Sequence, residues 1–211
     1  MIVKVCGMRD TENIRAVIEA GADWIGMIFW SKSPRHITRV PDIGKGVKRV
    51  GVFVDASEEE IIAAADDYAL DIVQLHGSET PESIRSLRQT IASATKRDIL
   101  IFKAISIKSA SDVSCYNQYE DCIDGFLFDT KCKTVGGSGE HFDWNVLTGY
   151  KGSKPFLLSG GIAPDDAQRV LQFAHPMMIG IDINSRFETA PGMKDAQAIK
   201  QFIEQIKNNR I

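Results

Sequence analysis

The run Val50-Gly51-Val52-Phe53-Val54 is apolar at every position, and Phe126-Leu127-Phe128 repeats this pattern further along the chain. A strand with one face in water alternates apolar and polar residues, whereas a strand that is buried on both faces is apolar throughout. Strands of the second kind belong to parallel sheets whose two faces are both covered. The two runs therefore predict an α/β protein that is built on a parallel sheet.

Similar short aliphatic runs lie on both sides of these two. They alternate with segments whose apolar residues recur at the three- and four-residue spacing of an amphipathic helix. The eight runs begin near Ile2, Trp24, Val50, Asp71, Ile99, Ile123, Pro155 and Met178. Eight strand-and-helix units in 211 residues predict one domain, residues 1–211, folded as a (β/α)₈ TIM barrel.

Helix boundary signals fall between the predicted strands. Ser57 and Glu60 have the spacing of a capping box. Thr80-Pro81 and Ala163-Pro164 each place a proline at a first helical position. Gly21 follows the first helical segment, where a left-handed C-cap residue is expected. These signals favour helices in the connections between strands.

The second connection departs from this pattern. Between His36 and Lys48 the chain carries one proline and two glycines, which disfavour a helix, so we predict a short or irregular second helical unit. An open doubly wound sheet is the competing architecture. Such a sheet usually has a glycine-rich nucleotide-binding turn after its first strand, and Cys6-Gly7-Met8 does not fit that turn.

The composition excludes several classes of partner. The chain has 25 basic and 28 acidic residues without a long basic run, so we expect no nucleic-acid partner. No apolar stretch approaches the length of a membrane span, and we expect no membrane partner. The first predicted strand begins near Ile2 without a targeting pattern. We therefore expect a cytoplasmic protein.

The four cysteines are Cys6, Cys115, Cys122 and Cys132. They form no C-x-x-C pair and have no histidine at ligand spacing, which argues against a zinc site and against a disulfide framework. Cys115 and Cys122 lie in an apparent helix, and we expect both to pack in the core on one helix face.

Two candidate acid–base residues close predicted strands. In a (β/α)₈ barrel the active site lies at the C-terminal ends of the strands, and Cys6 and Asp129 follow strands one and six. Lys4 shares a strand face with Cys6, so its charge is expected to favour the thiolate, a base. Partial burial is expected to raise the pKa of Asp129, so that it can be protonated when an acid is needed. The alternatives are a core cysteine and a carboxylate that caps a helix or pairs with Lys131 or Lys133.

Strands seven and eight end in segments suited to phosphate. Gly160 and Gly161 follow strand seven, and Asp182, Asn184 and Ser185 follow strand eight. Barrels commonly bind phosphate here with backbone amides and a short helix N-terminus, although glycines serve equally in tight turns. A further glycine cluster at 136–139 forms a loop that either covers a ligand or simply connects two elements.

Two more candidates lie above the same predicted mouth. Arg35, on the loop after strand two, carries a guanidinium that suits a carboxylate or a phosphate, although an exposed arginine is often only solvated. His76, after strand four, is a candidate to line the pocket, to cap a helix or to form a hydrogen bond in the wall.

Together these segments resemble the phosphoribosylanthranilate isomerase family. The resemblance runs in order along almost the whole chain. The matching segments are Lys4-Val5-Cys6-Gly7, Ser33-Pro34-Arg35, Gly51-Val52-Phe53-Val54, Gln74-Leu75-His76-Gly77, Asp129-Thr130, Gly136-Gly137-Ser138-Gly139, Phe142-Asp143-Trp144, Ser159-Gly160-Gly161-Ile162 and Pro191-Gly192.

The resemblance implies an isomerase of tryptophan biosynthesis. Its members convert N-(5-phosphoribosyl)anthranilate to 1-(2-carboxyphenylamino)-1-deoxyribulose 5-phosphate by an Amadori rearrangement, with a cysteine base and an aspartate acid that match Cys6 and Asp129. It also implies that Arg35 binds the anthranilate carboxylate and that the segments after strands seven and eight bind the phosphate. The partner is then a small phosphosugar, with neither metal nor cofactor, and the chain is a monomer or a homodimer.

One segment departs from the family's pattern. The family usually has glycine where this chain has Arg186, and we expect this arginine to point to solvent rather than to bind phosphate. Two alternatives share the predicted barrel. Indole-3-glycerol-phosphate synthase has the same phosphate site but carries an N-terminal extension, and an inert phosphosugar-binding module would need neither Cys6 nor Asp129.

Overall fold

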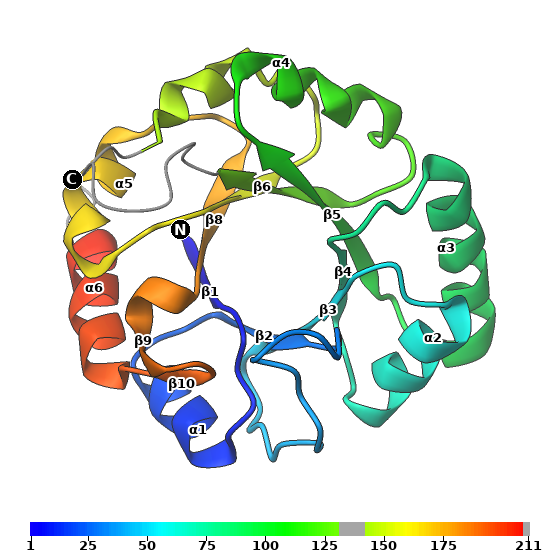
Figure 1. Cartoon of the computed structure of the whole chain (residues 1–211), viewed down its shortest axis with the longest axis horizontal. Helices are drawn as coiled ribbons and strands as arrows, with labels where there is room; N and C mark the ends of the chain where they lie inside the picture. The colour runs from blue at the N-terminus through cyan, green and yellow to red at the C-terminus, as the bar shows by residue number, and fades with distance from the viewer. Residues whose placement is uncertain (131–141, 209–211) are drawn as a thin grey trace.

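A closed barrel of eight strands forms the centre of the molecule (Figure 1). The computed structural model describes residues 1–130 and 142–208. Every strand pairs in parallel with the next one in chain order, and β8 returns to β1 through a register that runs from Ile2↔Gly180 to Val5↔Ile183. The strands are β1 (Ile2–Val5), β2 (Trp24–Ile28), β3 (Lys48–Phe53), β4 (Ile72–Leu75), β5 (Leu100–Ile107), β6 (Gly125–Thr130), β7 (Phe156–Ser159) and β8 (Met178–Ile183). The predicted (β/α)₈ TIM barrel is confirmed.

Helices surround this barrel and cover the outer face of its sheet (Figure 1). They are α1 (Thr11–Glu19), α2 (Glu58–Asp67), α3 (Pro81–Thr95), α4 (Ala110–Val113), α5 (Ala167–Gln172) and α6 (Ala196–Asn208). Among the described residues the ring also contains four 3₁₀ helices and the short strands β9 (Glu188–Ala190) and β10 (Met193–Lys194). The 3₁₀ helices are Ser114–Gln118, Trp144–Gly149, Pro164–Asp166 and Ser185–Phe187. No helix in the described part of the chain is long and apolar enough to cross a membrane.

The predicted helix signals lie where the helices begin and end. Ser57 and Glu60 form the capping box of α2, with each side chain accepting a hydrogen bond from the other residue's backbone N–H. Thr80 caps α3. Gly21 follows α1 with φ +101°, a left-handed conformation that glycine adopts without strain.

The connections contain fewer long helices than the periodicity suggested. Between β2 and β3 the chain forms no helix, and an isolated Ile28↔His36 bridge pairs it with the end of β2, which confirms the irregular second unit. After β5, however, α4 has four residues and gives way to a 3₁₀ helix at Ser114, and the described part of the next connection holds only a 3₁₀ helix. Serine, cysteine, tyrosine and asparagine after Val113 are weak helix formers, which accounts for the short α4.

The shared core position predicted for two cysteines is wrong. Cys122 is buried, but Cys115 is exposed. A seven-residue spacing returns to the same face only in a continuous α-helix, whereas the helix here is 3₁₀ and ends at Gln118. Cys132 lies outside the described residues.

The core has two layers. The larger one fills the space between the strands and the outer helices. The smaller one lies inside the barrel and includes Trp24, Phe102 and Leu127, with the rings of Trp24 and Phe102 in edge-to-face contact at 5.6 Å between centroids. This inner layer fills the barrel below the C-terminal ends of the strands, where the active site of such a barrel is expected.

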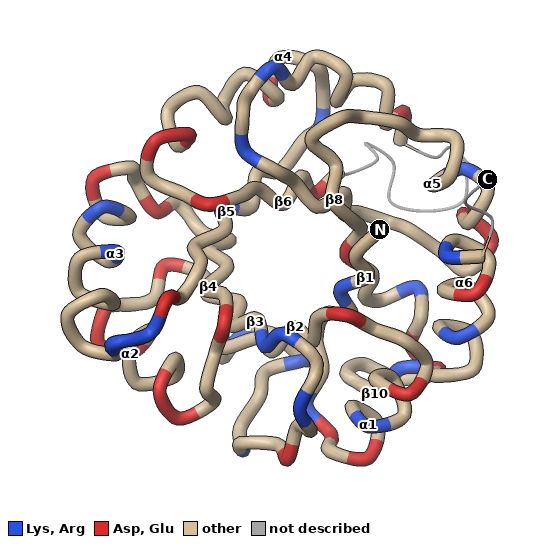
Figure 2. The backbone as a smooth tube through the Cα atoms, turned by 180° about the vertical axis from the view of Figure 1, so that it is seen from behind, with Lys and Arg blue, Asp and Glu red and all other residues tan. Residues whose placement is uncertain are grey.

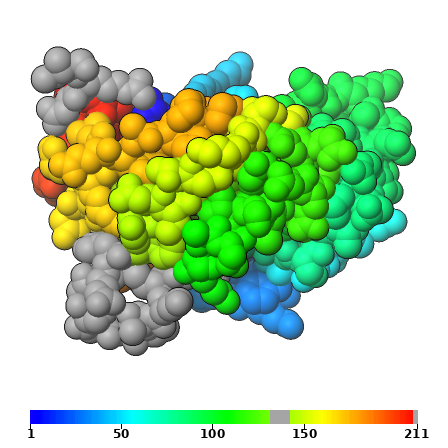
Figure 3. Space-filling view, turned by 90° about the horizontal axis from the view of Figure 1, so that it is seen from above, coloured from blue at the N-terminus to red at the C-terminus, as the bar shows by residue number. Residues whose placement is uncertain are grey.

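The outer surface follows the order of the chain. Figure 3 shows the elements succeeding one another around the molecule, from yellow through green to cyan. Basic and acidic residues are interspersed along the outer ring in Figure 2, with both signs present on neighbouring helices.

Candidate active site

A cavity of about 210 Å³ opens at the C-terminal ends of the strands. Its wall brings together eight of the nine site residues that the sequence predicted. They are Cys6, His76, Asp129, Gly160, Gly161, Asp182, Asn184 and Ser185. Arg35, the ninth, does not line the cavity but lies beside it. The strand ends therefore define the site.

Cys6 follows β1 and stands above a buried ion pair. Its backbone N–H donates to the carbonyl oxygen of Ile183 at 2.9 Å, which ties the end of β1 to β8. Lys4 is fully buried on the same strand face, and its Nζ lies 2.9 Å from Asp182 Oδ1. A Cβ at Gly26 would lie 3.0 Å from Cys6 Sγ, so β2 needs a small residue beside the thiol.

The expected effect of Lys4 on the thiol is outweighed. Burial raises the pKa of Cys6, the charge of Lys4 lowers it in part, and the nearby Asp182 carboxylate raises it again. The pKa of Cys6 therefore lies above its ordinary value. Lys4 favours the thiolate as expected, but burial, the largest effect, and the Asp182 charge together outweigh it.

Asp129 and His76 lie next to each other in the cavity wall. Asp129 lies on β6 opposite Ser159 of β7, and its Oδ2 is 3.6 Å from His76 Nε2. Their side chains are 16% and 32% exposed, so both reach the cavity without being fully solvated. His76 therefore contributes to the wall beside the candidate acid. Lys131 and Lys133, the alternative partners of Asp129, lie outside the described residues.

Asp182 lines the floor of the cavity. One of its oxygens accepts from Lys4, and the other is 3.3 Å from the hydroxyl of Ser159. Burial raises the pKa of Asp182, although Lys4 opposes that shift. With both oxygens engaged, this carboxyl group is better placed to fix Lys4 than to bind a substrate directly.

The glycine segment after β7 has the geometry that glycine alone allows. Gly160 and Gly161 have φ of +100° and +67°, and a Cβ at Gly160 would lie 1.9 Å from the carbonyl oxygen of Thr130. Next to it, Ser185 begins a short 3₁₀ helix after β8. The first N–H groups of a helix have no partner within it, so this corner of the cavity suits an anion. Arg186 is exposed and also lines the cavity, and its role stays a prediction.

Arg35 is held beside the cavity by an unpredicted partner. Its Nε lies 2.8 Å from Glu188 Oε1, and its Nη2 lies 2.6 Å from Glu188 Oε2. A Cβ at Gly7 would lie 2.7 Å from Arg35 Cδ and 2.9 Å from Asn184 Oδ1, so the arginine passes directly over Gly7. It thus lies next to the segment that carries Cys6.

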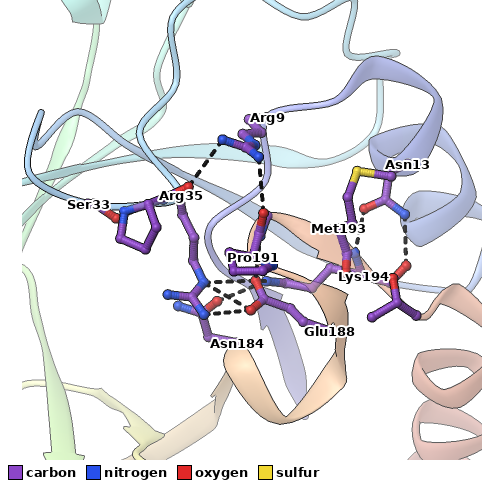
Figure 4. A network of polar contacts seen from close by, with 12 residues as sticks. Arg9, Asn13, Ser33, Arg35, Asn184, Glu188, Pro191, Met193 and Lys194 are labelled. Atoms are coloured by element: carbon purple, nitrogen blue, oxygen red, sulfur yellow. Dashed lines mark hydrogen bonds and ion pairs between the residues drawn. The ribbon is translucent and has the colours of Figure 1, made fainter.

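Lys194, on β10, is a second unpredicted residue that contacts Glu188 (Figure 4). Its Nζ lies 2.5 Å from Glu188 Oε1 and 2.8 Å from Asn184 Oδ1. Burial alone would raise the pKa of Glu188, but hydrogen bonds from Arg35 and Lys194 lower it to about 2. Burial also lowers the pKa of Lys194, against the opposing effect of Glu188. Neither Glu188, two residues after Arg186, nor Lys194, a lone lysine before the last helix, was predicted as a site residue.

Metal ligands do not gather in the described part of the chain. No group of three or more histidine, cysteine, aspartate or glutamate side chains there could hold an ion.

Comparisons with known proteins agree with this geometry. Residues 3–205 match the family model described as N-(5'-phosphoribosyl)anthranilate (PRA) isomerase. The chain is 47% identical over 208 residues to N-(5'-phosphoribosyl)anthranilate isomerase from Phocaeicola vulgatus, with 98% of each chain covered.

Solved structures give the same result. Phosphoribosyl anthranilate isomerase from Thermotoga maritima has a TM-score of 0.83 and 34% identity, covering 99% of this chain and 100% of its own. A complex of such an isomerase with reduced 1-(o-carboxyphenylamino)-1-deoxyribulose 5-phosphate has a TM-score of 0.81 and 31% identity over the same shares. The match to the isomerase model over nearly all of the chain shows that this protein belongs to the N-(5'-phosphoribosyl)anthranilate isomerase family.

Proposed function

We propose that Cys6 is the general base and Asp129 the general acid of an Amadori rearrangement that converts N-(5-phosphoribosyl)anthranilate to 1-(2-carboxyphenylamino)-1-deoxyribulose 5-phosphate. As a member of its family, the protein is an isomerase of tryptophan biosynthesis. One observation carries the assignment of the two residues. Cys6 and Asp129 come from β1 and β6, far apart in sequence, and they line the same cavity.

The reaction needs one acid and one base. Asp129 protonates the ring oxygen of the ribose, and the C1–O bond breaks as the nitrogen lone pair forms a protonated imine. The Cys6 thiolate then removes the proton from C2, and the C–H electron pair moves to give an enolamine. Tautomerisation of the enolamine gives the ketone. The C1 carbon is reduced and C2 is oxidised within one molecule, so no external electron acceptor enters the scheme.

The remaining site residues support substrate binding at two ends. The amides around Gly160 and Gly161, with Asn184 and Ser185, suit the phosphate. Arg35 lies over Gly7, next to Cys6, and suits the carboxylate of the anthranilate ring. The reacting sugar then lies in the cavity that Cys6 and Asp129 both line.

The test measures turnover by anthranilate fluorescence in purified variants. Cys6→Ser and Asp129→Asn are each expected to lower kcat by about two to four orders of magnitude, the usual contribution of a positioned acid or base. The Michaelis constant should change by less than about threefold, because neither group binds the two ends of the substrate.

Cys122→Ser is the matched control. Cys122 is also a buried thiol, but it donates to the carbonyl oxygen of Tyr119 on the outside of the barrel. Its replacement should leave kcat unchanged. Near-normal turnover of a folded Cys6→Ser enzyme would remove Cys6 as the base, and substrate binding without any wild-type turnover would favour the inert binding module instead.

A further inference from the structure

We propose that Glu188 is a positioning residue for substrate recognition: it holds the Arg35 guanidinium beside the cavity in the orientation that receives the aromatic carboxylate. This inference rests on the proposed function, in which Arg35 binds that carboxylate. It adds a residue that contacts no substrate itself and acts through Arg35.

The geometry of the ion pair is specific. Glu188 engages Arg35 through Nε and Nη2, at 2.8 and 2.6 Å, in the parallel two-bond arrangement that fixes the plane of a guanidinium. Within residues 1–130 and 142–208 no hydrogen bond involves Nη1 of Arg35. The pair therefore presents one edge of the guanidinium to Glu188 and leaves another edge for a second carboxylate.

Glu188 is itself held from three sides. Besides Arg35, its Oε1 accepts from Lys194 Nζ and from the backbone N–H of Gly192 at 3.0 Å. Its side chain is 5% exposed. A carboxylate fixed in this way does not follow the arginine, so the arginine must adopt the orientation that the carboxylate sets.

The groups around Glu188 carry one more positive than negative charge, so they can bind one more anion. Arg35 and Lys194 are two cationic groups that share a single carboxylate. A substrate carboxylate would bring the group to balance, which favours its binding over that of a neutral ring. Lys194 is 0% exposed and cannot move to solvent, whereas Arg35 is 20% exposed and can. Loss of the Glu188 charge is therefore expected to displace Arg35 first.

The same group joins both ends of the substrate site. Lys194 also donates to Asn184, which lines the cavity on the phosphate side. Arg9 donates to the carbonyl oxygens of Pro34 and Pro191, at 3.1 Å each, and so connects the Arg35 loop to the turn after β9 (Figure 4). Glu188 thus sets the position of Arg35 relative to the phosphate corner.

The test compares two inhibitors by calorimetry. One is 1-(2-carboxyphenylamino)-1-deoxyribitol 5-phosphate, and the other is 1-phenylamino-1-deoxyribitol 5-phosphate, which lacks the carboxylate. Glu188→Gln keeps the shape of the side chain but removes its charge. We expect the variant to bind the carboxylated inhibitor at least about tenfold more weakly and the other one within about twofold, because only the first uses Arg35. Glu188→Asp keeps the charge and should restore part of the lost affinity.

Asp124→Asn is the matched control, since Asp124 pairs with Arg88 at 2.8 Å before β6, away from the cavity. It should leave both affinities unchanged. Equal weakening of the two inhibitors in Glu188→Gln would show a merely structural role and would overturn the proposal. Unchanged or tighter binding of the carboxylated inhibitor would also overturn it, because the Glu188 charge would then only screen Arg35.

Arg35→Ala separates this proposal from the proposed function. If Arg35→Ala keeps its preference for the carboxylated inhibitor, Arg35 does not bind the carboxylate and both assignments fail. If Arg35→Ala loses that preference while Glu188→Gln keeps it, only the positioning role is overturned. Wild-type turnover tests the isomerase chemistry independently of either variant.

Discussion

Cys6 lies where burial and charge act on the thiol in opposite directions. Burial raises its pKa, Lys4 opposes the rise, and Asp182 reinforces it. At neutral pH the thiolate fraction of Cys6 should therefore be smaller than that of a free cysteine. A thiol with a raised pKa is deprotonated in a smaller fraction of molecules, but its thiolate is a stronger base. A stronger base suits removal of a carbon-bound proton.

Alkylation measures this pKa directly. We expect the rate of Cys6 modification by iodoacetamide, followed by peptide mass spectrometry, to rise with pH to a midpoint above that of N-acetylcysteine amide in the same buffers. Lys4→Met should move the midpoint further up, because it removes the group that lowers the pKa. A wild-type midpoint below the reference thiol would show that Lys4 outweighs burial after all.

Gly7 is the second residue whose replacement is informative. Its φ of +76° disfavours any side chain, and a Cβ there would press on both Arg35 and Asn184. Gly7→Ala should destabilise the fold by about 1 to 3 kcal/mol and raise the Michaelis constant, since both neighbours serve the substrate. Urea denaturation and initial rates give the two quantities.

Gly44→Ala is the control for Gly7→Ala. A Cβ at Gly44 meets no heavy atom within 4 Å, so stability and Michaelis constant should both stay unchanged. Equal effects of the two substitutions would mean that Gly7 has no special relation to Arg35.

For single residues, the sequence predicted the side chains at the ends of strands and missed the ion pair between two segments that are distant in sequence. Cys6 and Asp129 line the cavity because parallel strands bring their C-terminal ends together whatever their distance in sequence. No such rule predicts the pairing of Arg35 with Glu188, which lie 153 residues apart, on the loop after β2 and at the start of the short strand β9. That contact depends on the three-dimensional path of both segments.

Among the elements, α2 has the most complete predicted boundary. The Ser57 side chain accepts from Glu60 N–H, and Glu60 accepts from Ser57 N–H at 2.9 Å. Ser57→Ala should lower the free energy of unfolding by about 1 kcal/mol, the usual value of an N-cap, without changing turnover. Ser93→Ala, in the exposed interior of α3, should change stability by less than about 0.5 kcal/mol. A loss as large in Ser93→Ala would mean that the cap is not the cause.

The sequence analysis did not predict the two strands that have only two or three residues. β9 and β10 have three and two residues, too few to show an alternation. Gly192 has φ +82° and allows the turn between them. The hairpin matters because it carries Glu188 and Lys194 to Arg35. After β5 the sequence analysis instead predicted too much: apolar spacing suggested a full helix, but only four α-helical residues formed.

For the whole molecule, the pairing of β1 with β8 closes the barrel and joins its first strand to its last. Ile2 pairs with Gly180 at this seam, and the Lys4–Asp182 ion pair crosses it just below Cys6. A barrel closed in this way is expected to unfold as one unit, because opening any seam exposes both core layers to water. The prediction of one domain over residues 1–211 can be tested by this cooperativity.

Gly180→Ala tests the seam itself. A Cβ at Gly180 would lie 2.2 Å from the carbonyl oxygen of Ile2, and backbone atoms cannot turn aside as a side-chain tip does. We expect a loss of about 3 kcal/mol and a fall in Tm of about 5 to 10 °C, with circular dichroism and tryptophan fluorescence still following one transition. Gly149→Ala, where a Cβ meets open space, should melt like the wild type. Two separate transitions in Gly180→Ala would show that the chain holds two folding units, because a weakened seam in a single cooperative barrel lowers the stability of every strand together.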